Sequence, residues 1–177
     1  MAAQITHRQR ALYLKCVLYE CSVLARSVLQ LQTTEDNRLA EVFKTSGVLK
    51  LRTLYDFLHR PNASDSIKRS MFNVYNPTVP AQMNQQWETW LTHQSINTYF
   101  AHLDRRRIEK TIPQPKFKRG EKAVIKRAIK LLDEARDFAD SVIAHADFPG
   151  LDTYGHRYWD DFQTTLKELH KSPPTTA

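Results

Sequence analysis

Apolar side chains recur every three or four residues along the first part of the chain. Between His7 and Leu31 the apolar positions are Ala11, Leu14, Val17, Leu18, Cys21, Leu24, Ala25, Val28 and Leu29. This spacing places them on one broad face of an α-helix, because residues three and four apart lie on the same side of neighbouring turns. The pattern predicts a long amphipathic helix over residues 7–31.

A second helical pattern follows after a short polar break. Thr33 lies three residues before Asp36, and a hydroxyl three residues ahead of a carboxylate is the capping-box signature of a helix start. Apolar residues then recur with helical spacing, and Pro61 ends the helix because a proline pushes the preceding residue out of helical geometry. Gly47 lies inside this helix and predicts either a kink or close helix packing.

Residues 61–81 are the least regular part of the chain. A loop of this length is unusual in a compact bundle, so we expect it to be either functional or mobile. Its middle part holds the apolar or aromatic residues Met71, Phe72, Val74 and Tyr75. They predict that part of the loop packs back onto the bundle.

Three more helical segments complete the predicted fold: residues 82–110, residues 119–146 and a shorter one over 156–170. Pro113 and Pro115 lie in the first connector, and Pro149 precedes Gly150 in the second. Helices with short to moderate loops predict an all-α fold, an antiparallel bundle of four main helices plus a short C-terminal helix. We expect a single domain over residues 1–172 and a disordered tail over 173–177.

Composition excludes several classes of protein. The four glycines lie apart from one another, so the chain has no glycine-rich phosphate-binding loop. Hairpin turns favour Asn-Gly or Asp-Gly, and neither pair occurs, which argues against an all-β fold. No apolar run approaches the ~18–20 residues of a membrane span, and the first residues do not resemble a secretory signal. We therefore expect a cytoplasmic protein with no membrane contact.

The two cysteines, Cys16 and Cys21, are five residues apart in the first predicted helix. Their directions differ by ~140°, so they can neither form a disulfide nor share a metal ion. We expect both to behave as small core residues in a reducing compartment. No motif in the chain calls for a metal or another cofactor.

Positive charge is concentrated in one segment. Between Arg105 and Lys130, eleven basic and two acidic residues give a net charge of +9 in 26 positions, against +7 for the whole chain. Such a segment attracts RNA, DNA or an acidic protein partner. The alternative is a solvated helix face and a basic loop that keep the protein soluble. The basic residues are Arg105, Arg106, Arg107, Lys110, Lys116, Lys118, Arg119, Lys122, Lys126, Arg127 and Lys130.

The third predicted helix holds the residues most suggestive of chemistry. His102 precedes Arg105 and Arg106 by three and four residues, so the three side chains share one helix face. An imidazole there could accept a proton from an RNA 2′-hydroxyl while the guanidinium groups hold the phosphate. Asn97 would be an orienting polar group. The alternative is that His102 has a structural role and hydrogen-bonds a neighbour.

Residues 35–110 resemble a group of small helical bacterial proteins. The pattern of that group is Arg-x-Leu-x-Asp-Phe on one helix, here Arg52 to Phe57, and a later helix with Trp followed by Asn-x-x-x-x-His-Leu, here Asn97 to Leu103. The group in turn resembles the HEPN superfamily. This resemblance implies a four-helix bundle that often dimerises, and many members are metal-independent endoribonucleases of toxin–antitoxin or phage-defence systems.

The chain departs from the HEPN catalytic motif, in which an Arg precedes the His by four to six residues. Residues 95–97 are Ser, Ile and Asn, so the phosphate-stabilising Arg is missing. The departure favours a non-catalytic member. We expect a HEPN-like accessory or defence-type protein, a homodimer through an apolar helix face, that binds RNA or an acidic protein through residues 105–130. If it is an enzyme, His102, Asn97, Arg105 and Arg106 would carry metal-independent RNA cleavage. The alternative is a helical interaction module, an adaptor or antitoxin-like subunit without chemistry.

Other suggestive pairs favour structural roles. His156 and Asp160 are spaced as i and i+4 in an aromatic and acidic stretch, but two ligands alone do not make a metal site. Arg52 and Asp56 have the same spacing and predict an ion pair on a helix surface.

Overall fold

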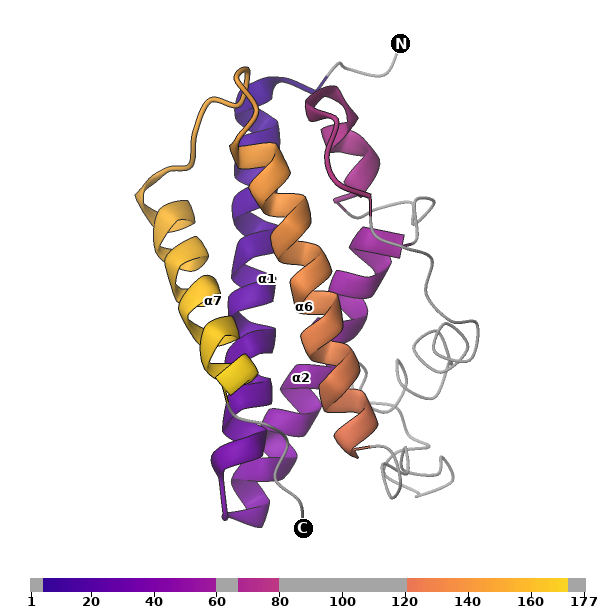
Figure 1. The fold of residues 1–177 in the computed structure, drawn as a ribbon, viewed down its shortest axis with the longest axis vertical. Coiled ribbons are helices and arrows are strands. Elements are labelled where there is room, and N and C mark those ends of the chain that lie inside the picture. Colours follow the sequence, from indigo (N-terminus) through magenta and orange to yellow (C-terminus); the bar gives the residue numbers. More distant parts are fainter. Residues whose placement is uncertain (1–4, 60–66, 80–120, 172–177) are drawn as a thin grey trace, which may run out of the picture.

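The computed structural model describes residues 5–59, 67–79 and 121–171. In these ranges the chain forms four α-helices and one 3₁₀ helix, without a strand (Figure 1). The elements are α1 (His7–Thr33), α2 (Asn37–His59), η1 (Arg69–Tyr75), α6 (Glu121–Ile143) and α7 (Thr153–Lys171). The prediction of an all-α fold is confirmed. The predicted third helix, over residues 82–110, and the predicted tail lie outside the described residues.

Local sequence explains where α1 and α2 begin. Thr6 caps α1, because its hydroxyl accepts a hydrogen bond from the Gln9 backbone N–H at 3.2 Å while its own N–H donates to the Gln9 side chain at 2.8 Å. The predicted cap of α2 is wrong. Asp36 itself is the cap, and its carboxylate accepts from the backbone N–H groups of Arg38 and Leu39 at 2.7 and 3.3 Å. Thr33 instead ends α1.

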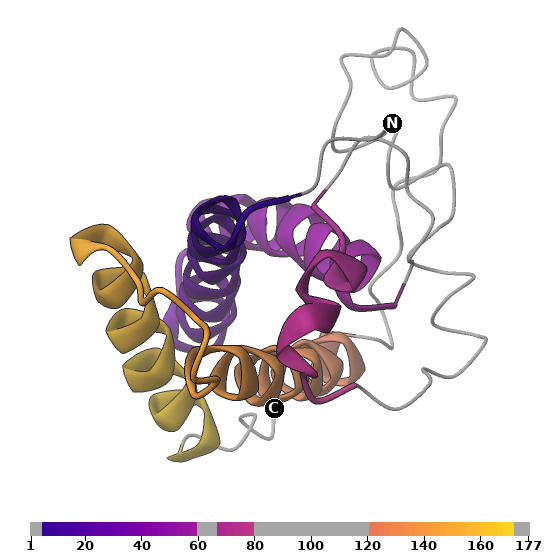
Figure 2. The same cartoon turned by 90° about the horizontal axis from the view of Figure 1, so that it is seen from above.

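Helices that follow each other directly run antiparallel, α1 with α2 and α6 with α7 (Figure 1). Helices α1 and α6 are also antiparallel, but α1 with α7 and α2 with α6 run parallel, which differs from a purely antiparallel bundle (Figure 1). Lys15 pairs with Asp152 and Arg26 with Asp161, so the contacts advance in the same direction along α1 and α7. Helices α2 and α6 also point the same way. Viewed along the bundle, α1, α2 and α6 surround the core, and α7 covers the outside of α1 and α6 (Figure 2).

The core is anchored by three phenylalanine rings from three elements. Phe57 of α2, Phe72 of η1 and Phe138 of α6 meet edge to face, with ring centroids 5.3–6.0 Å apart and planes at 83–86°. This geometry suits the quadrupoles of aromatic rings. All three side chains are buried. The prediction that the loop packs back onto the bundle is therefore confirmed for Phe72, although Val74 remains exposed.

Tyr75, the last residue of η1, packs at the end of the bundle where α1 begins. Its ring is buried and contacts His145 and Phe148 at centroid distances of 5.4 and 5.6 Å, and its hydroxyl lies 2.8 Å from Nδ1 of His7. The buried Arg10 side chain donates to the Met71 carbonyl at 2.6 Å. Burial raises the pKa of Tyr75, which keeps its hydroxyl protonated as a hydrogen-bond partner.

Helix α7 is more than the short addition that the sequence predicts. It has 19 residues and begins three residues earlier than expected, because the Asp152 carboxylate accepts from the Gly155 N–H at 2.7 Å. The cysteine prediction is right for Cys21, which is buried and whose pKa burial raises. It is wrong for Cys16, which lies exposed on α1. None of the described helices is long and apolar enough to cross a membrane.

Candidate polyanion-binding surface

Most of the predicted site residues fall outside the described part of the chain. These are the four candidate catalytic residues and five further basic residues of the segment: Asn97, His102, Arg105, Arg106, Arg107, Lys110, Lys116, Lys118 and Arg119. The remaining four belong to α6. Lys122 lies in its first turn, and its side chain is not described. The described side chains of the predicted surface are therefore those of Lys126, Arg127 and Lys130.

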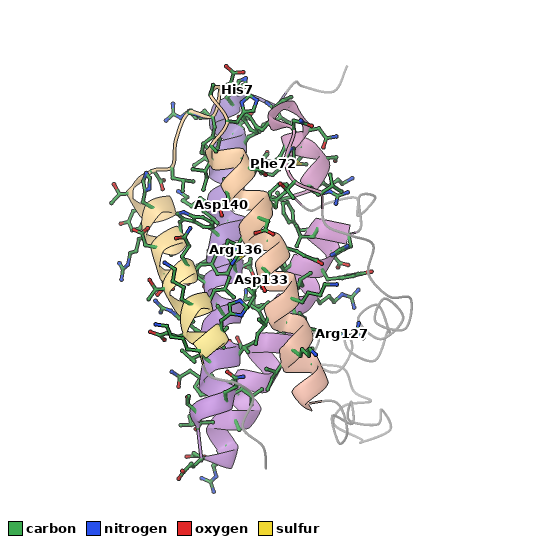
Figure 3. All side chains as sticks on the ribbon, viewed as in Figure 1. His7, Phe72, Arg127, Asp133, Arg136 and Asp140 are labelled. Atoms are coloured by element: carbon green, nitrogen blue, oxygen red, sulfur yellow. The ribbon has the colours of Figure 1, made fainter. Side chains whose placement is uncertain are left out.

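The first half of α6 presents these basic residues outward. Lys126 and Lys130 are both exposed, and their spacing of four residues places them on one side of the helix. The Lys130 ammonium lies 3.8 Å from the Glu134 carboxylate, yet its side chain remains 65% exposed. Arg127 is half-buried and lies toward the beginning of α6, before the acidic residues (Figure 3). The two lysines are thus open to a partner in solution.

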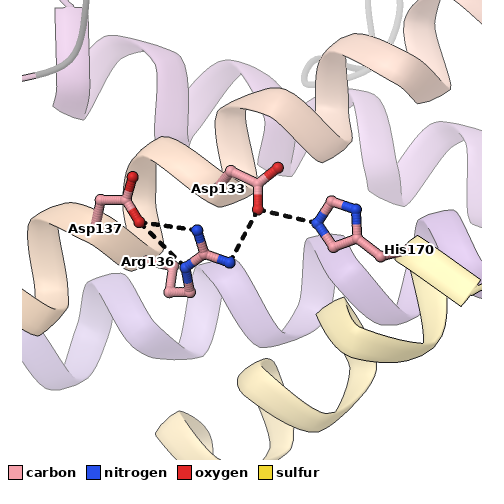
Figure 4. A network of polar contacts seen from close by, with 4 residues as sticks. All are labelled: Asp133, Arg136, Asp137 and His170. Atoms are coloured by element: carbon pink, nitrogen blue, oxygen red, sulfur yellow. Dashed lines mark hydrogen bonds and ion pairs between the residues drawn. The ribbon is translucent and has the colours of Figure 1, made fainter.

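The second half of α6 is acidic, and most of its charged side chains are paired. Asp133 accepts from Nε2 of His170 on α7 at 3.0 Å, and the same carboxylate lies 3.2 Å from the Arg136 guanidinium (Figure 4). Arg136 also donates to Asp137 at 2.9 Å. This hydrogen bond raises the pKa of Arg136, so the guanidinium stays charged within the network.

Glu134 pairs with the opposite neighbour, α2. Its carboxylate accepts from Nε2 of His59 at 3.0 Å, and the two side chains are only 13% and 7% exposed. The Tyr55 ring stacks on the His59 ring with centroids 5.2 Å apart. Two consecutive carboxylates, Asp133 and Glu134, therefore connect α6 to α7 and to α2. The sequence carries no signal for these pairs, because the partners are separated by 37 and 75 residues.

A further polar cluster joins α1 to α7. Asp161 accepts hydrogen bonds from the Ser22 hydroxyl and from the Arg26 guanidinium. Burial raises the pKa of the Asp161 carboxyl, but these two hydrogen bonds and the positive charges of Arg26 and Arg157 together outweigh it, so the pKa lies below its ordinary value of 3.8. The Tyr19 and Tyr158 rings meet edge to face beside it, with centroids 5.3 Å apart.

Two predictions about isolated pairs have different outcomes. His156 and Asp160 are exposed, and among the described residues no three His, Cys, Asp or Glu side chains gather as metal ligands. Arg52 and Asp56 do form the expected pair at 3.5 Å. The expected surface position is wrong, because the side chains are only 16% and 24% exposed. Asp56 lines a cleft between α1 and α2.

Comparisons of the chain with protein-family models, with curated proteins and with solved structures find no match. The described residues form an all-α protein in which α6 has a mostly paired acidic second half and exposed lysines in its first half.

Proposed function

We propose that this protein binds RNA through the basic segment over residues 105–130. The observation that carries the proposal is the exposure of Lys126 and Lys130 on one side of α6. A row of lysines open to solvent can approach the phosphates of a nucleic acid backbone and release its counterions. The excess of nine positive charges in this segment supports a polyanion as the partner.

The position of these residues along α6 also favours an anionic partner. The N-terminus of a helix carries the positive end of the macrodipole, so acidic side chains stabilise it and basic ones do not. In α6 the basic residues Lys122, Lys126 and Arg127 occupy the first two turns. Apart from Glu121, the first residue of the helix, this end of α6 carries positive charge of the same sign as the dipole. This placement strengthens the attraction for phosphate.

RNA cleavage is the catalytic form of the same proposal. In this catalytic form, His102 would accept the proton of a 2′-hydroxyl, and Arg105 or Arg106 would hold the phosphate. Asn97 would be the orienting polar group. This part depends on the HEPN resemblance and on residues outside the described ranges. The chain lacks the Arg that precedes the His in the family motif, so binding without cleavage is the form that we propose.

The test is a mobility assay with end-labelled single-stranded RNA in EDTA. The double variant Lys126→Glu/Lys130→Glu should bind more weakly. The slope of log affinity against log salt should become shallower by about 0.7 for each phosphate that the protein no longer neutralises. The matched control is Lys167→Glu/Lys171→Glu, which changes the same charge at the same spacing on exposed positions of α7. Equal weakening in both variants would show that RNA affinity depends on the net charge of the protein and not on the basic residues of α6.

A His102→Ala variant separates binding from cleavage in the same assay. Fragments that disappear in this variant would establish a metal-independent ribonuclease. Retarded but intact RNA would support binding alone. RNA that is neither retarded nor cut at low salt would contradict the proposal and favour an adaptor or antitoxin-like subunit with a protein partner.

A further inference from the structure

One carboxylate links the exposed lysines of α6 to a buried histidine. The two oxygens of Glu134 have different partners: Oε2 lies 3.0 Å from Nε2 of His59 on α2, and Oε1 lies 3.8 Å from the Lys130 ammonium. The exposed fraction of the side chains rises along this row, from 7% for His59 to 13% for Glu134 and 65% for Lys130. The row therefore leads from the interior of the bundle to the proposed RNA surface.

The Glu134 carboxylate opposes the positive charge of that surface. It lies one helical turn after Lys130, and its side chain is largely buried. Solvent and salt therefore screen its charge less than they screen the charge of an exposed residue. A phosphate that approaches Lys130 competes with this carboxylate for the ammonium group and is repelled by its negative charge.

His59 is placed to change the charge behind Glu134. A histidine side chain changes its charge between about pH 5 and pH 8. The titratable groups against its ring are Glu134 on α6 and Tyr55 on its own helix, which stacks on it with centroids 5.2 Å apart. Asp56, three residues earlier on α2, lines the cleft toward α1. A proton on His59 adds a positive charge beside the carboxylate and so offsets the negative charge that acts on Lys130.

We propose that the His59–Glu134 pair regulates polyanion binding at the α6 lysines: the charge of Glu134 weakens it, and protonation of His59 strengthens it. This inference rests on the proposed RNA binding and adds a pH dependence to that function. Both are positioning residues, because they act on the RNA through Lys130 and do not contact it. The affinity for RNA therefore increases as the pH falls, and a measurable share of the increase comes from His59.

The carboxylate is tested by Glu134→Gln, which removes the negative charge and preserves the shape of the side chain. At pH 8 this variant should bind single-stranded RNA about two- to fourfold more tightly than the wild type in the mobility assay. The matched control is Asp160→Asn, which removes one negative charge from an exposed position on α7. The control should change the affinity less. Equal gains in both variants would attribute the effect to net charge and overturn the proposal.

The histidine is tested by the pH dependence of RNA affinity between pH 8.5 and pH 5.5. His59→Gln retains a donor for Glu134 but takes up no proton, so its gain in affinity on acidification should be about two- to fourfold smaller than that of the wild type. His156→Gln removes an exposed histidine from α7 and should keep the wild-type response. The other histidines are common to these proteins, so their contribution cancels. The same response in His59→Gln and the wild type would contradict the role of His59.

A heparin column separates failure of this inference from failure of RNA binding. Heparin is a sulfated polyanion, and the salt concentration at which the protein elutes measures its affinity without RNA. At pH 8, Glu134→Gln should elute at higher salt than both the wild type and Asp160→Asn, and circular dichroism checks that each variant is folded. If this order holds while the wild type does not bind RNA, the proposed function fails and the regulation by charge stands. Elution of Glu134→Gln together with the wild type would overturn the inference.

Discussion

The two halves of α6 use charge in opposite ways. In the second half, Asp133 and Glu134 are paired with His170 and His59, so their charges connect α6 to two neighbouring helices. In the first half, Lys126 and Lys130 are exposed, and Lys130 has only the loose contact to Glu134. The difference separates charges that stabilise the bundle from charges that are open to a partner. A charge cluster in the sequence cannot by itself be assigned to either group.

The two halves of α6 also differ in packing, and the second half is again the one that is more closely joined to the bundle. Phe138 in the second half is fully buried against two other phenylalanine rings. Ile125 in the first half lines a small cavity of about 30 Å³, together with Gly47 and Phe43 of α2. We therefore expect the second half to contribute more to stability than the first.

We expect the largest changes in stability from alanine substitutions at these two core positions, and we expect the two changes to differ. Phe138→Ala should lower the free energy of unfolding by about 4 kcal/mol, because it removes a ring from a tightly packed cluster. Ile125→Ala should cost about 2 kcal/mol, since its side chain is smaller and already borders a cavity. Urea denaturation followed by circular dichroism measures both. Equal destabilisation would show that the two halves are packed equally well.

The buried pair between α6 and α2 should give the next largest effect. Glu134→Ala leaves His59 without its partner and should lower the free energy of unfolding by about 2 kcal/mol. Glu134→Gln retains a hydrogen-bond acceptor for His59 and should cost less. Both are measured in the same urea series near pH 7. A glutamine variant as unstable as the alanine variant would assign the effect to charge instead of the hydrogen bond.

A similar paired charge, Asp161, joins α7 to α1, and its contribution to the free energy of unfolding should depend on pH. Its pKa is below 3.8 in the folded protein, so the unfolded chain takes up the proton first as the pH falls. Its contribution should be complete above about pH 5 and disappear as the pH falls through 3.8 toward the folded pKa. Near pH 7, Asp161→Asn should lower the free energy of unfolding by at most about 1 kcal/mol, because Arg26 is largely exposed.

The measurement for Asp161 is the unfolding free energy of the wild type and of Asp161→Asn between pH 3 and pH 7. The two curves should converge at the acidic end. Curves that stay parallel over this range would show that ionisation of Asp161 contributes nothing to the α1–α7 contact.

The smallest effect should come from Gly47, and it should be stabilising. A methyl group there would lie 3.6 Å from Cβ of Ser27, which is ordinary van der Waals contact. Gly47→Ala should therefore raise the free energy of unfolding by about 0.5–1 kcal/mol, through the helix propensity of alanine. Thermal unfolding of the variant and the wild type measures this gain as a higher melting temperature. A lower melting temperature would mean that the helices cannot accommodate even a methyl group at this end.

Within the described ranges, hydrophobic periodicity was sufficient to predict the helices. The predicted ranges 7–31 and 119–146 correspond to α1 and α6, with differences of at most three residues at the ends. The candidate site was less predictable. Exposure of Lys126 and Lys130 could be expected from their polar positions on an amphipathic helix, whereas the burial of Arg52 and Asp56 could not. Their i,i+4 spacing is the same on a solvated face and at a helix–helix cleft.

The amino-acid sequence by itself determined the all-α class, the main helix boundaries and the concentration of positive charge before Lys130, because these depend on local spacing and composition. Only the tertiary structure decided which charges pair. Helices α1 and α7 lie parallel and bring Arg26 to Asp161, and α2 and α6 bring His59 to Glu134. These pairs join residues 135 and 75 positions apart, and their formation depends on how the helices pack. Local sequence patterns do not encode that packing.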